Sequence, residues 1–328
     1  MKHGSNLITG IDRHLASWKS DDDPASGEFS DWIDTRGYPQ LIVMDGGDIK
    51  FRGGPWNGIR FTGTANLKTN PYYNFTFVLN HREIYYQYNL INTSVLMRVV
   101  LQPNGSLDRL LWMDDKQEWS LYLTTQIDRC DQYAVCGPFG SCNIDSSPIC
   151  VCLKGFEPTS PDQWRKTEWS QGCRHIQTLD CNPGEGFNKY SNLKLPDTRG
   201  SWYNQTMTLV ECKKMCKSNC SCTAYTTTNI SGTGSGCLLW FGNLTDIKRF
   251  AENGDTLYIR LSASELGTPG NEPGHDPENR SGDEDLELPV FGLSTIHKAT
   301  NNFSINNKLG EGGFGPVYKA PLLRVPPR

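Results

Sequence analysis

The fold is decided by the stretch CDQYAVCGPFGSCNIDSSPICVC (residues 130–152), which holds five cysteines in 23 residues. All 12 cysteines of the 328-residue chain lie between Cys130 and Cys237, and the residues on either side have none. This density is typical of disulfide scaffolds. An even number of cysteines in one short stretch also indicates an oxidising compartment.

Acceptor motifs for N-linked glycans support the same compartment. The pattern N-x-S/T occurs seven times beside the cysteines, and two further matches lie downstream at Asn279 and Asn302. The seven candidate glycosylation sites are Asn74, Asn92, Asn104, Asn204, Asn219, Asn229 and Asn243. Their number within 170 residues favours a glycosylated, exported surface.

Composition excludes some functions and leaves one conflict. The net charge is −4, which gives no electrostatic argument for nucleic acid or for an anionic membrane as a partner. Residues 1–20 contain no apolar stretch of the kind found in signal peptides, and no apolar run approaches the 18 residues of a membrane span. We therefore expect the sequence to be a fragment or an aberrant product of a longer chain.

Short strands are predicted before the cysteines. Residues 1–30 suggest irregular structure, whereas 75–125 suggest an antiparallel meander with strands at 75–79, 83–90, 94–102, 106–113 and 118–125. Asn104-Gly105 is a strong two-residue hairpin signal because both residues tolerate positive φ. Cross-strand packing is favoured over ligand stacking for Trp112 and Trp119.

One helix is predicted among the cysteines. Thr208 and Glu211 form a capping-box pair at the start of TLVECKKMCKSNC (208–220). Cys212 and Cys216 then lie one turn apart on the same face, where we expect them to point into the core. The segment 255–261 is predicted to be a strand. These patterns define a mainly β chain with one α+β module.

Several motifs together resemble one plant family. The chain contains five motifs in the order found in the S-locus receptor kinases, also called G-type lectin S-receptor-like serine/threonine kinases. In chain order they are GPWNGIRF (54–61), CDQYAVCGPFGSCNIDSSPICVCLKGFEP, WSQGC (169–173), ECKKMCKSNCSCTAY and GSGCLLWFG (234–242). The resemblance runs from about residue 7 to 320. It implies a lectin-domain remnant at 1–29, an antiparallel β-rich S-locus glycoprotein domain at 30–125, an EGF-like module at 126–173, a PAN/apple module at 181–262, and a juxtamembrane segment with a truncated kinase start at 289–320. Composition indicates a disordered linker at 263–288, and we expect residues 321–328 to be an unstructured tail.

The resemblance also implies how the cysteines pair. It suggests the bridges Cys130–Cys142 and Cys136–Cys150 in the EGF-like module, which leaves Cys152–Cys173, and the bridges Cys212–Cys237 and Cys216–Cys222 in the PAN module. Cys181 and Cys220 remain, and we pair them with each other. Zinc is the alternative use of such cysteines, but paired CxxC knuckles are missing from the sequence. We expect no metal.

The segment GEGGFGPV (310–317) matches the GxGxxGxV loop of protein kinases. The matching positions are Gly310, Gly312, Gly315 and Val317, and by family resemblance they mark a remnant of an ATP-binding loop. Lys319 comes too early to be the strand lysine that pairs with the phosphates, and the catalytic-loop and metal-binding aspartates are not found. No catalytic residue and no working cofactor are therefore expected, and ATP enters only through the resemblance.

The function implied by the resemblance is that of a receptor ectodomain at the plasma membrane or outside the cell. Its partner would be an extracellular protein or peptide, for which a cysteine-rich protein is one candidate, in pollen recognition or defence signalling. A full-length receptor is a further implied partner, as a homo- or heterodimer. Two alternatives stay open: a member of a receptor serine/threonine kinase family whose kinase domain is lost here, and a truncation product without function.

Overall fold

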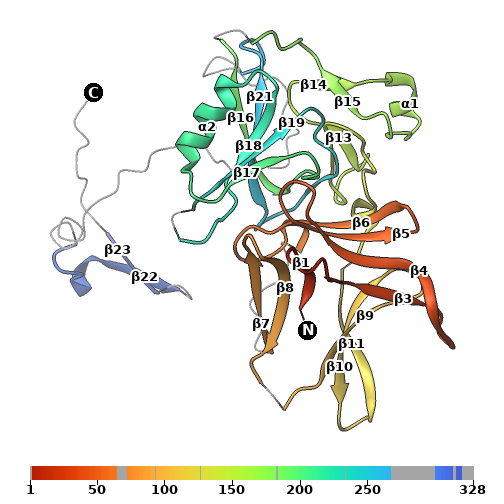
Figure 1. Ribbon diagram of the computed structural model, residues 1–328. Coiled ribbons are helices and arrows are strands. Elements are labelled where there is room, and N and C mark those ends of the chain that lie inside the picture. The colour runs from red at the N-terminus through yellow and green to blue at the C-terminus, as the bar shows by residue number, and fades with distance from the viewer. Residues whose placement is uncertain are drawn as a thin grey trace. The chain divides into compact units, whose positions relative to one another are not determined.

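The computed structural model describes residues 2–64, 72–92, 94–125, 127–181, 184–232, 234–266, 300–312 and 315–319 (Figure 1). The chain divides into two compact units, Met1–Asn271 and Glu272–Arg328. Most of the predicted linker (263–288) and all of the predicted tail (321–328) lie outside the described residues. The mainly β, antiparallel architecture predicted from the sequence is confirmed.

Residues 2–125, here called the β region, form three antiparallel sheets. The first has the order β3 (Leu15–Ser20), β4 (Asp23–Asp34), β5 (Gln40–Asp45) and β6 (Asp48–Pro55). The second has the order β2 (Asp12–Arg13), β1 (His3–Asn6), β8 (Glu83–Leu90) and β7 (Tyr73–Leu79). The third has the order β11 (Glu118–Thr124), β10 (Leu107–Met113) and β9 (Met97–Leu101).

The prediction that residues 1–30 are irregular is wrong. β1 pairs with β8 in the register His3↔Tyr86, and β4 continues through residues 29 and 30 into its pairing with β5. Local patterning could not reveal these strands, because their residues are mostly polar and their partners lie up to about 80 positions away. Long-range pairing overrides weak local preference here.

The predicted meander exists as strands but not as one sheet. β7 to β11 match the five predicted segments closely, yet β8 pairs with β1 and β7, while β9 pairs with β10. The hairpin at Asn104-Gly105 is present, but it is not the predicted two-residue turn. Gln102 N donates to the carbonyl oxygen of Ser106, and of the two predicted residues only Gly105 has a positive φ, 80°. Trp112 and Trp119 are paired across β10 and β11 with ring centroids 5.5 Å apart, which confirms the packing interpretation.

An aromatic core holds the β region together. Val43 and Phe51 are almost fully buried, and Trp56 stacks on Phe77 with ring centroids 5.1 Å apart. Phe61 meets both of these rings at steep angles. Aromatic side chains bury large areas, so this cluster supplies much of the region's stability.

Residues 127–266, here called the cysteine region, are organised around an eight-stranded sheet. Its order is β13 (Cys150–Cys152), β12 (Gly140–Cys142), β20 (Ile247–Arg249), β16 (Gly186–Lys194), β21 (Asp255–Leu261), β18 (Cys222–Thr226), β19 (Cys237–Phe241) and β17 (Trp202–Asn204). β12 pairs parallel to β20, so the stretch 130–152 is part of the sheet to which residues 186–261 contribute the other strands.

Two helices and a small hairpin complete the cysteine region. β14 (Phe156–Pro158) pairs with β15 (Cys173–His175), and α1 (Pro161–Arg165) lies between them in the chain. α2 (Leu209–Ser218) has the predicted capping box between Thr208 and Glu211 and buries Cys212 and Cys216. A short 3-10 turn occurs at Arg129–Asp131 in this region, and another occurs at Thr62–Thr64 in the β region. No helix in the described part of the chain is long and apolar enough to cross a membrane.

Buried charges connect the β region to the cysteine region. Arg52 is fully buried and donates from Nε to Asp246 Oδ2 at 2.8 Å, and Lys194 Nζ lies 2.7 Å from the same oxygen. Arg52 also donates to Gln40 and to the carbonyl oxygens of Leu195 and Asp246. Because a buried charge needs a partner and hydrogen bonds, this network fixes the two regions in one arrangement.

The second unit contains a hairpin in its described residues. β22 (Lys308–Gly312) pairs with β23 (Gly315–Tyr318), and a 3-10 turn at Ile305–Asn307 precedes them. Phe303 and Tyr318 pack edge to face with centroids 5.3 Å apart.

Candidate functional site

Six disulfides cross-link the cysteine region and leave no free cysteine. They are Cys130–Cys142, Cys136–Cys150, Cys152–Cys173, Cys181–Cys220, Cys212–Cys237 and Cys216–Cys222. These are the four pairs that the family resemblance implies and the two, Cys152–Cys173 and Cys181–Cys220, that pair the remaining cysteines. The first three lie within residues 130–173 and the other three within 181–237, so no bridge crosses between the two predicted modules.

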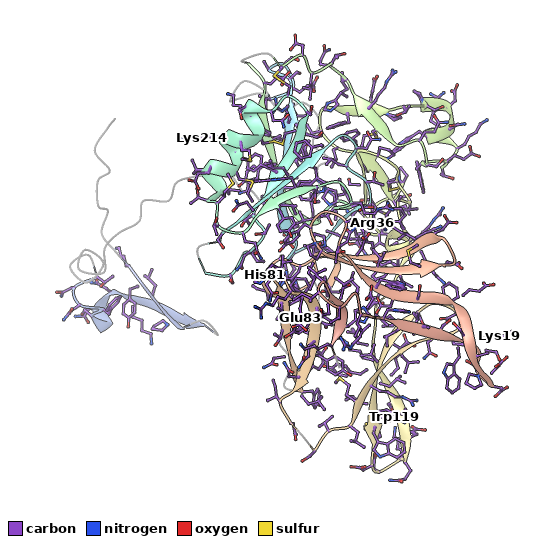
Figure 2. All side chains as sticks on the ribbon, in the orientation of Figure 1. Lys19, Arg36, His81, Glu83, Trp119 and Lys214 are labelled. Atoms are coloured by element: carbon purple, nitrogen blue, oxygen red, sulfur yellow. A yellow bond between two sulfur atoms is a disulfide. The ribbon has the colours of Figure 1, made fainter. Side chains whose placement is uncertain are left out.

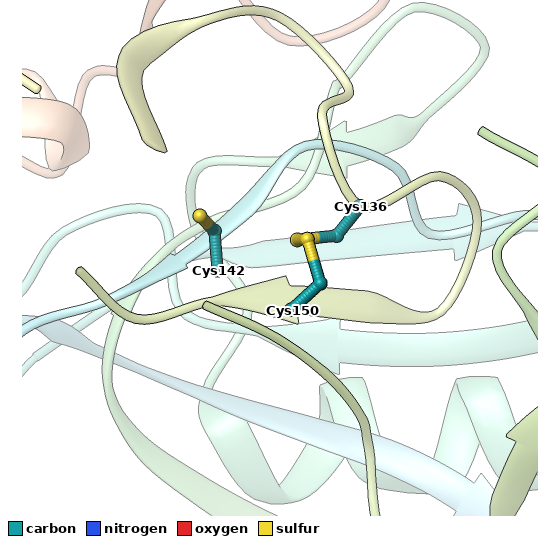
Figure 3. Close-up of side chains that lie close together, drawn as sticks. All are labelled: Cys136, Cys142 and Cys150. Atoms are coloured by element: carbon teal, nitrogen blue, oxygen red, sulfur yellow. A yellow bond between two sulfur atoms is a disulfide. The ribbon is translucent and has the colours of Figure 1, made fainter. Parts of the chain in front are cut away.

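One group of cysteines has the proximity of a metal site. The sulfur atoms of Cys136, Cys142 and Cys150 lie within 4.8 Å of one another (Figure 3). However, Cys136 is bonded to Cys150, and Cys142 is bonded to Cys130. Zinc is bound by thiolates, and a disulfide sulfur is not a thiolate. In this oxidised state the cluster consists of sulfur atoms from two neighbouring disulfides, which have a structural role.

The seven candidate glycosylation sites lie on the surface to different degrees. Asn74, Asn92, Asn104, Asn219 and Asn243 are exposed, whereas Asn204 and Asn229 are half-buried. At the two half-buried sites the sequon hydroxyls donate to the asparagine side chain: Thr206 Oγ1 to Asn204 Oδ1 at 2.9 Å, and Ser231 Oγ to Asn229 Oδ1 at 2.6 Å. Whether these asparagines carry glycans stays a prediction.

The three-stranded sheet β11-β10-β9 presents one face with a recognisable chemistry. Register places Leu110 opposite both Arg98 and Leu121, and Trp112 opposite Trp119. These five residues therefore lie on the same side, here called the outer face. Figure 2 shows Trp119 at the hairpin of β10 and β11. The alternation of side chains along the strands could have predicted this face.

The outer face is exposed and rich in apolar surface. Leu121 is 60% exposed, and the guanidinium of Arg98 lies 4.3 Å from the ring centroid of Trp119. Both tryptophans are half-buried. Tryptophan and arginine are enriched where proteins bind one another, so this face is the strongest candidate for a recognition surface.

The kinase-like motif lies in the hairpin of the second unit. Gly310 pairs with Val317 and Gly312 pairs with Gly315 across β22 and β23. A hairpin is the structure that a kinase glycine-rich loop adopts over ATP phosphates. The structure brings these four positions together, but the described residues of this unit, 300–312 and 315–319, add only a short turn to the hairpin.

Taken together, these features define a disulfide-stapled, antiparallel β protein of the ectodomain type. Family models match in two places: the S-locus glycoprotein domain over residues 51–160 and the PAN-like domain over residues 181–247. The first match spans part of the predicted EGF-like module, whose separate existence and boundaries stay a prediction.

Known proteins of the same kind match nearly the whole chain. The "Receptor-like serine/threonine-protein kinase SD1-8" of Arabidopsis thaliana is 34% identical over 98% of this chain and 45% of its own length. The "S-locus-specific glycoprotein S6" of Brassica oleracea is 37% identical over 81% of this chain and 61% of its own length. A "Putative inactive G-type lectin S-receptor-like serine/threonine-protein kinase SRK" of Arabidopsis thaliana is 31% identical over 98% of this chain and 69% of its own length.

The chain therefore belongs to the family of G-type lectin S-receptor-like serine/threonine kinases and S-locus glycoproteins. It spans about half the length of the receptor kinases that it matches.

Proposed function

We propose that residues 2–266 act as a receptor-type ectodomain that recognises an extracellular protein or peptide. The observation that carries this proposal is the exposed outer face of the β9–β11 sheet on a body stapled by six disulfides. Relatives named receptors and S-locus-specific glycoproteins support the same class of function. Pollen recognition in self-incompatibility and defence signalling are the processes in which such recognition would serve.

The geometry suits a protein ligand better than a small one. The outer face lies on a three-stranded sheet, and β11 is one of the two edge strands of that sheet. An edge strand offers unpaired backbone groups, while Leu121 and the tryptophans offer apolar contact. A cysteine-rich protein fits as the partner because a compact, cross-linked ligand loses little conformational entropy on binding. A full-length receptor is a second partner that could dimerise with this chain.

The proposal places the chain outside the cell or at the plasma membrane, where its disulfides are stable. It assigns no phosphoryl transfer and no cofactor to residues 1–328. Transfer needs a strand lysine and acidic magnesium ligands besides the glycine-rich hairpin, and we assign none of these roles within this sequence. ATP binding by the hairpin and a truncation product without function are the competing proposals.

Binding of cysteine-rich peptides tests this function. The oxidised chain would be immobilised and exposed to a panel of oxidised, secreted cysteine-rich plant peptides, with affinity measured by biolayer interferometry. For a peptide that binds, Leu121→Lys should weaken binding about tenfold or more, because it places a charge in an apolar contact. Val210→Lys is the matched control, since Val210 is 65% exposed on α2. Equal effects of both variants, or no bound peptide, would contradict the proposal.

A further inference from the structure

A cavity of about 100 Å³ lies beneath the β9–β11 sheet, inside the β region. Its walls are mostly apolar and include Leu41, Trp56, Phe61, Phe75 and Leu107. Val99 and Arg109 contribute from the side of the sheet opposite to the outer face. Ten lining residues, among them Arg60, Thr64 and Leu123, are half-buried, so the cavity has a rim near solvent.

A carboxyl group without a hydrogen-bond partner faces this cavity. The side chain of Asp31 on β4 is 4% exposed, and its Oδ1 has no hydrogen bond. The nearest titratable group is His3, whose Nε2 lies 3.7 Å from Asp31 Oδ2 and is also without a hydrogen bond. A buried polar atom left unpaired costs about 1–3 kcal/mol. Such a pair of atoms is unusual in a structural core and points to a missing group.

Two guanidinium groups, those of Arg60 and Arg109, line the cavity. Arg109 donates to the hydroxyls of Tyr73 at 2.6 Å and Tyr86 at 2.9 Å, whereas the buried Nε of Arg60 has no hydrogen bond. Burial raises the pKa of Asp31 well above its usual range, although Arg109 opposes the shift. Burial and the nearby His14 lower the pKa of His3 to about 4, so its imidazole is neutral at pH 7.

A hydroxyl group is the chemistry that satisfies Asp31 in either protonation state. It donates to a carboxylate and accepts from a carboxylic acid. An added ammonium would instead place a third cation beside Arg60 and Arg109. The aromatic walls favour a flat apolar body. The volume is below the roughly 150 Å³ of a closed cavity that accommodates benzene. The body is therefore limited to one ring at most, part of which extends past the rim at Arg60, Thr64 and Leu123.

We propose that this cavity binds a small aromatic alcohol of the phenol class. The ring would lie among Trp56, Phe61 and Phe75, and the hydroxyl would hydrogen-bond to Asp31. This site goes beyond the proposed function, because its ligand and its location differ from those of the outer face.

Binding of p-cresol and p-xylene to the oxidised full chain tests the proposal. The two probes have nearly the same shape, and only p-cresol has a hydroxyl. Titration monitored by ligand-observed NMR should show p-cresol binding about tenfold or more tightly, which is the effect expected for one hydrogen bond to a buried carboxyl. In Asp31→Leu the preference should fall to about onefold. Asp23→Leu, on the same strand but outside the cavity, should keep the preference of the native chain.

The location of the probe provides a measurement that needs no variant. Bound p-cresol should give nuclear Overhauser contacts to the aromatic protons of Trp56 and Phe61. Equal affinities for the two probes in the native chain, contacts to other aromatic residues, or no saturable binding would each overturn the proposal. The last outcome would mean that the cavity holds water only. Leu121→Lys should leave p-cresol binding unchanged, which separates this site from the recognition surface.

Discussion

The β region and the cysteine region are both mainly antiparallel, yet they are stabilised in different ways. The β region contains no cysteine and depends on a continuous apolar core around Phe51 and Trp56. Part of the cysteine region is built from strands of only three residues, such as β12 and β14, and two of its core clusters consist largely of cystines. Strands this short bury little apolar area, so covalent links supplement the apolar core around Leu193, Trp240 and Ile259, which the longer strands of the region build.

Reduction of the disulfides should therefore have the largest effect and should act on one region first. Each bridge contributes about 2–4 kcal/mol in the chain-entropy model. We expect that a reductant abolishes protection from hydrogen exchange in residues 130–173, where one core cluster is largely cystine, while protection in β5 and β6 falls less. Exchange followed by mass spectrometry measures both regions in one experiment. Simultaneous and equal loss would show that they unfold as one cooperative unit.

Asp246 is the point where the two regions depend on each other most. Its Oδ2 meets both Arg52 and Lys194, and its Oδ1 accepts from the backbone of Ala134 at 3.1 Å. Burial lowers the pKa of Lys194, although Asp246 opposes this shift. Asp246→Ala should lower the free energy of unfolding by about 3–5 kcal/mol, because it leaves two buried cations uncompensated. Urea unfolding of the oxidised protein measures this change.

The control for Asp246→Ala is an ion pair outside the buried network that connects the β region to the cysteine region. Asp162 and Arg165 lie 2.5 Å apart but are both highly exposed. Asp162→Ala should change the free energy of unfolding by less than about 1 kcal/mol, since exposed pairs contribute little. Similar losses in the two variants would mean that the buried network does not hold the regions together.

The same contrast explains what could be predicted from the sequence. Elements of the cysteine region could be predicted because their motifs are local. The capping box at Thr208 and Glu211 and the spacing of Cys212 and Cys216 depend on neighbouring residues. β8 and β10 could be predicted from their apolar and aromatic runs. These signals determine elements whose partners are close in the chain.

The rest could not be predicted because it depends on residues far apart in the chain. No local pattern distinguishes Arg52 from an exposed arginine, and its partner Asp246 is 194 positions away. His3 and Asp31 of the cavity lie on strands whose polar residues suggest an irregular segment. The outer face followed a period of two, but its exposure required knowledge of how the sheets divide between β8 and β9.

Asp255, which contacts the β region through Asn57, should make the free energy of unfolding depend on pH. It lies on β21 and accepts from Asn57 Nδ2 at 3.0 Å through both carboxyl oxygens. Burial raises its pKa to about 6, although the bond from Asn57 and the charge of Arg60 oppose the shift. The folded protein therefore binds more protons than the unfolded chain between pH 4 and 6, and this contribution to stability is lost as pH rises through 6.

Asp255→Asn removes this titration. The free energy of unfolding of the native chain relative to the variant should fall by about 2–3 kcal/mol from pH 4 to pH 7. Urea unfolding of both proteins at the two pH values measures the difference, in which other titrating groups cancel. If the native chain and the variant differ by the same free energy of unfolding at both pH values, Asp255 titrates normally and its surroundings accommodate its charge.

Helix capping tests whether local signals still matter where disulfides already hold the chain. Thr208 caps α2 by accepting from the backbone of Glu211 at 3.3 Å, whereas Ser160 precedes α1 and makes no side-chain cap hydrogen bond. Thr208→Ala should cost about 1 kcal/mol and Ser160→Ala close to nothing. Both residues belong to the cysteine region, so unfolding curves of the oxidised variants compare them directly. If Thr208→Ala has no effect in the oxidised protein but destabilises the reduced one, the bridges from Cys212 and Cys216 alone position α2. A cost in the oxidised protein would show that the capping box and the disulfides act together, since the cap orders the first turn that presents Cys212 to Cys237.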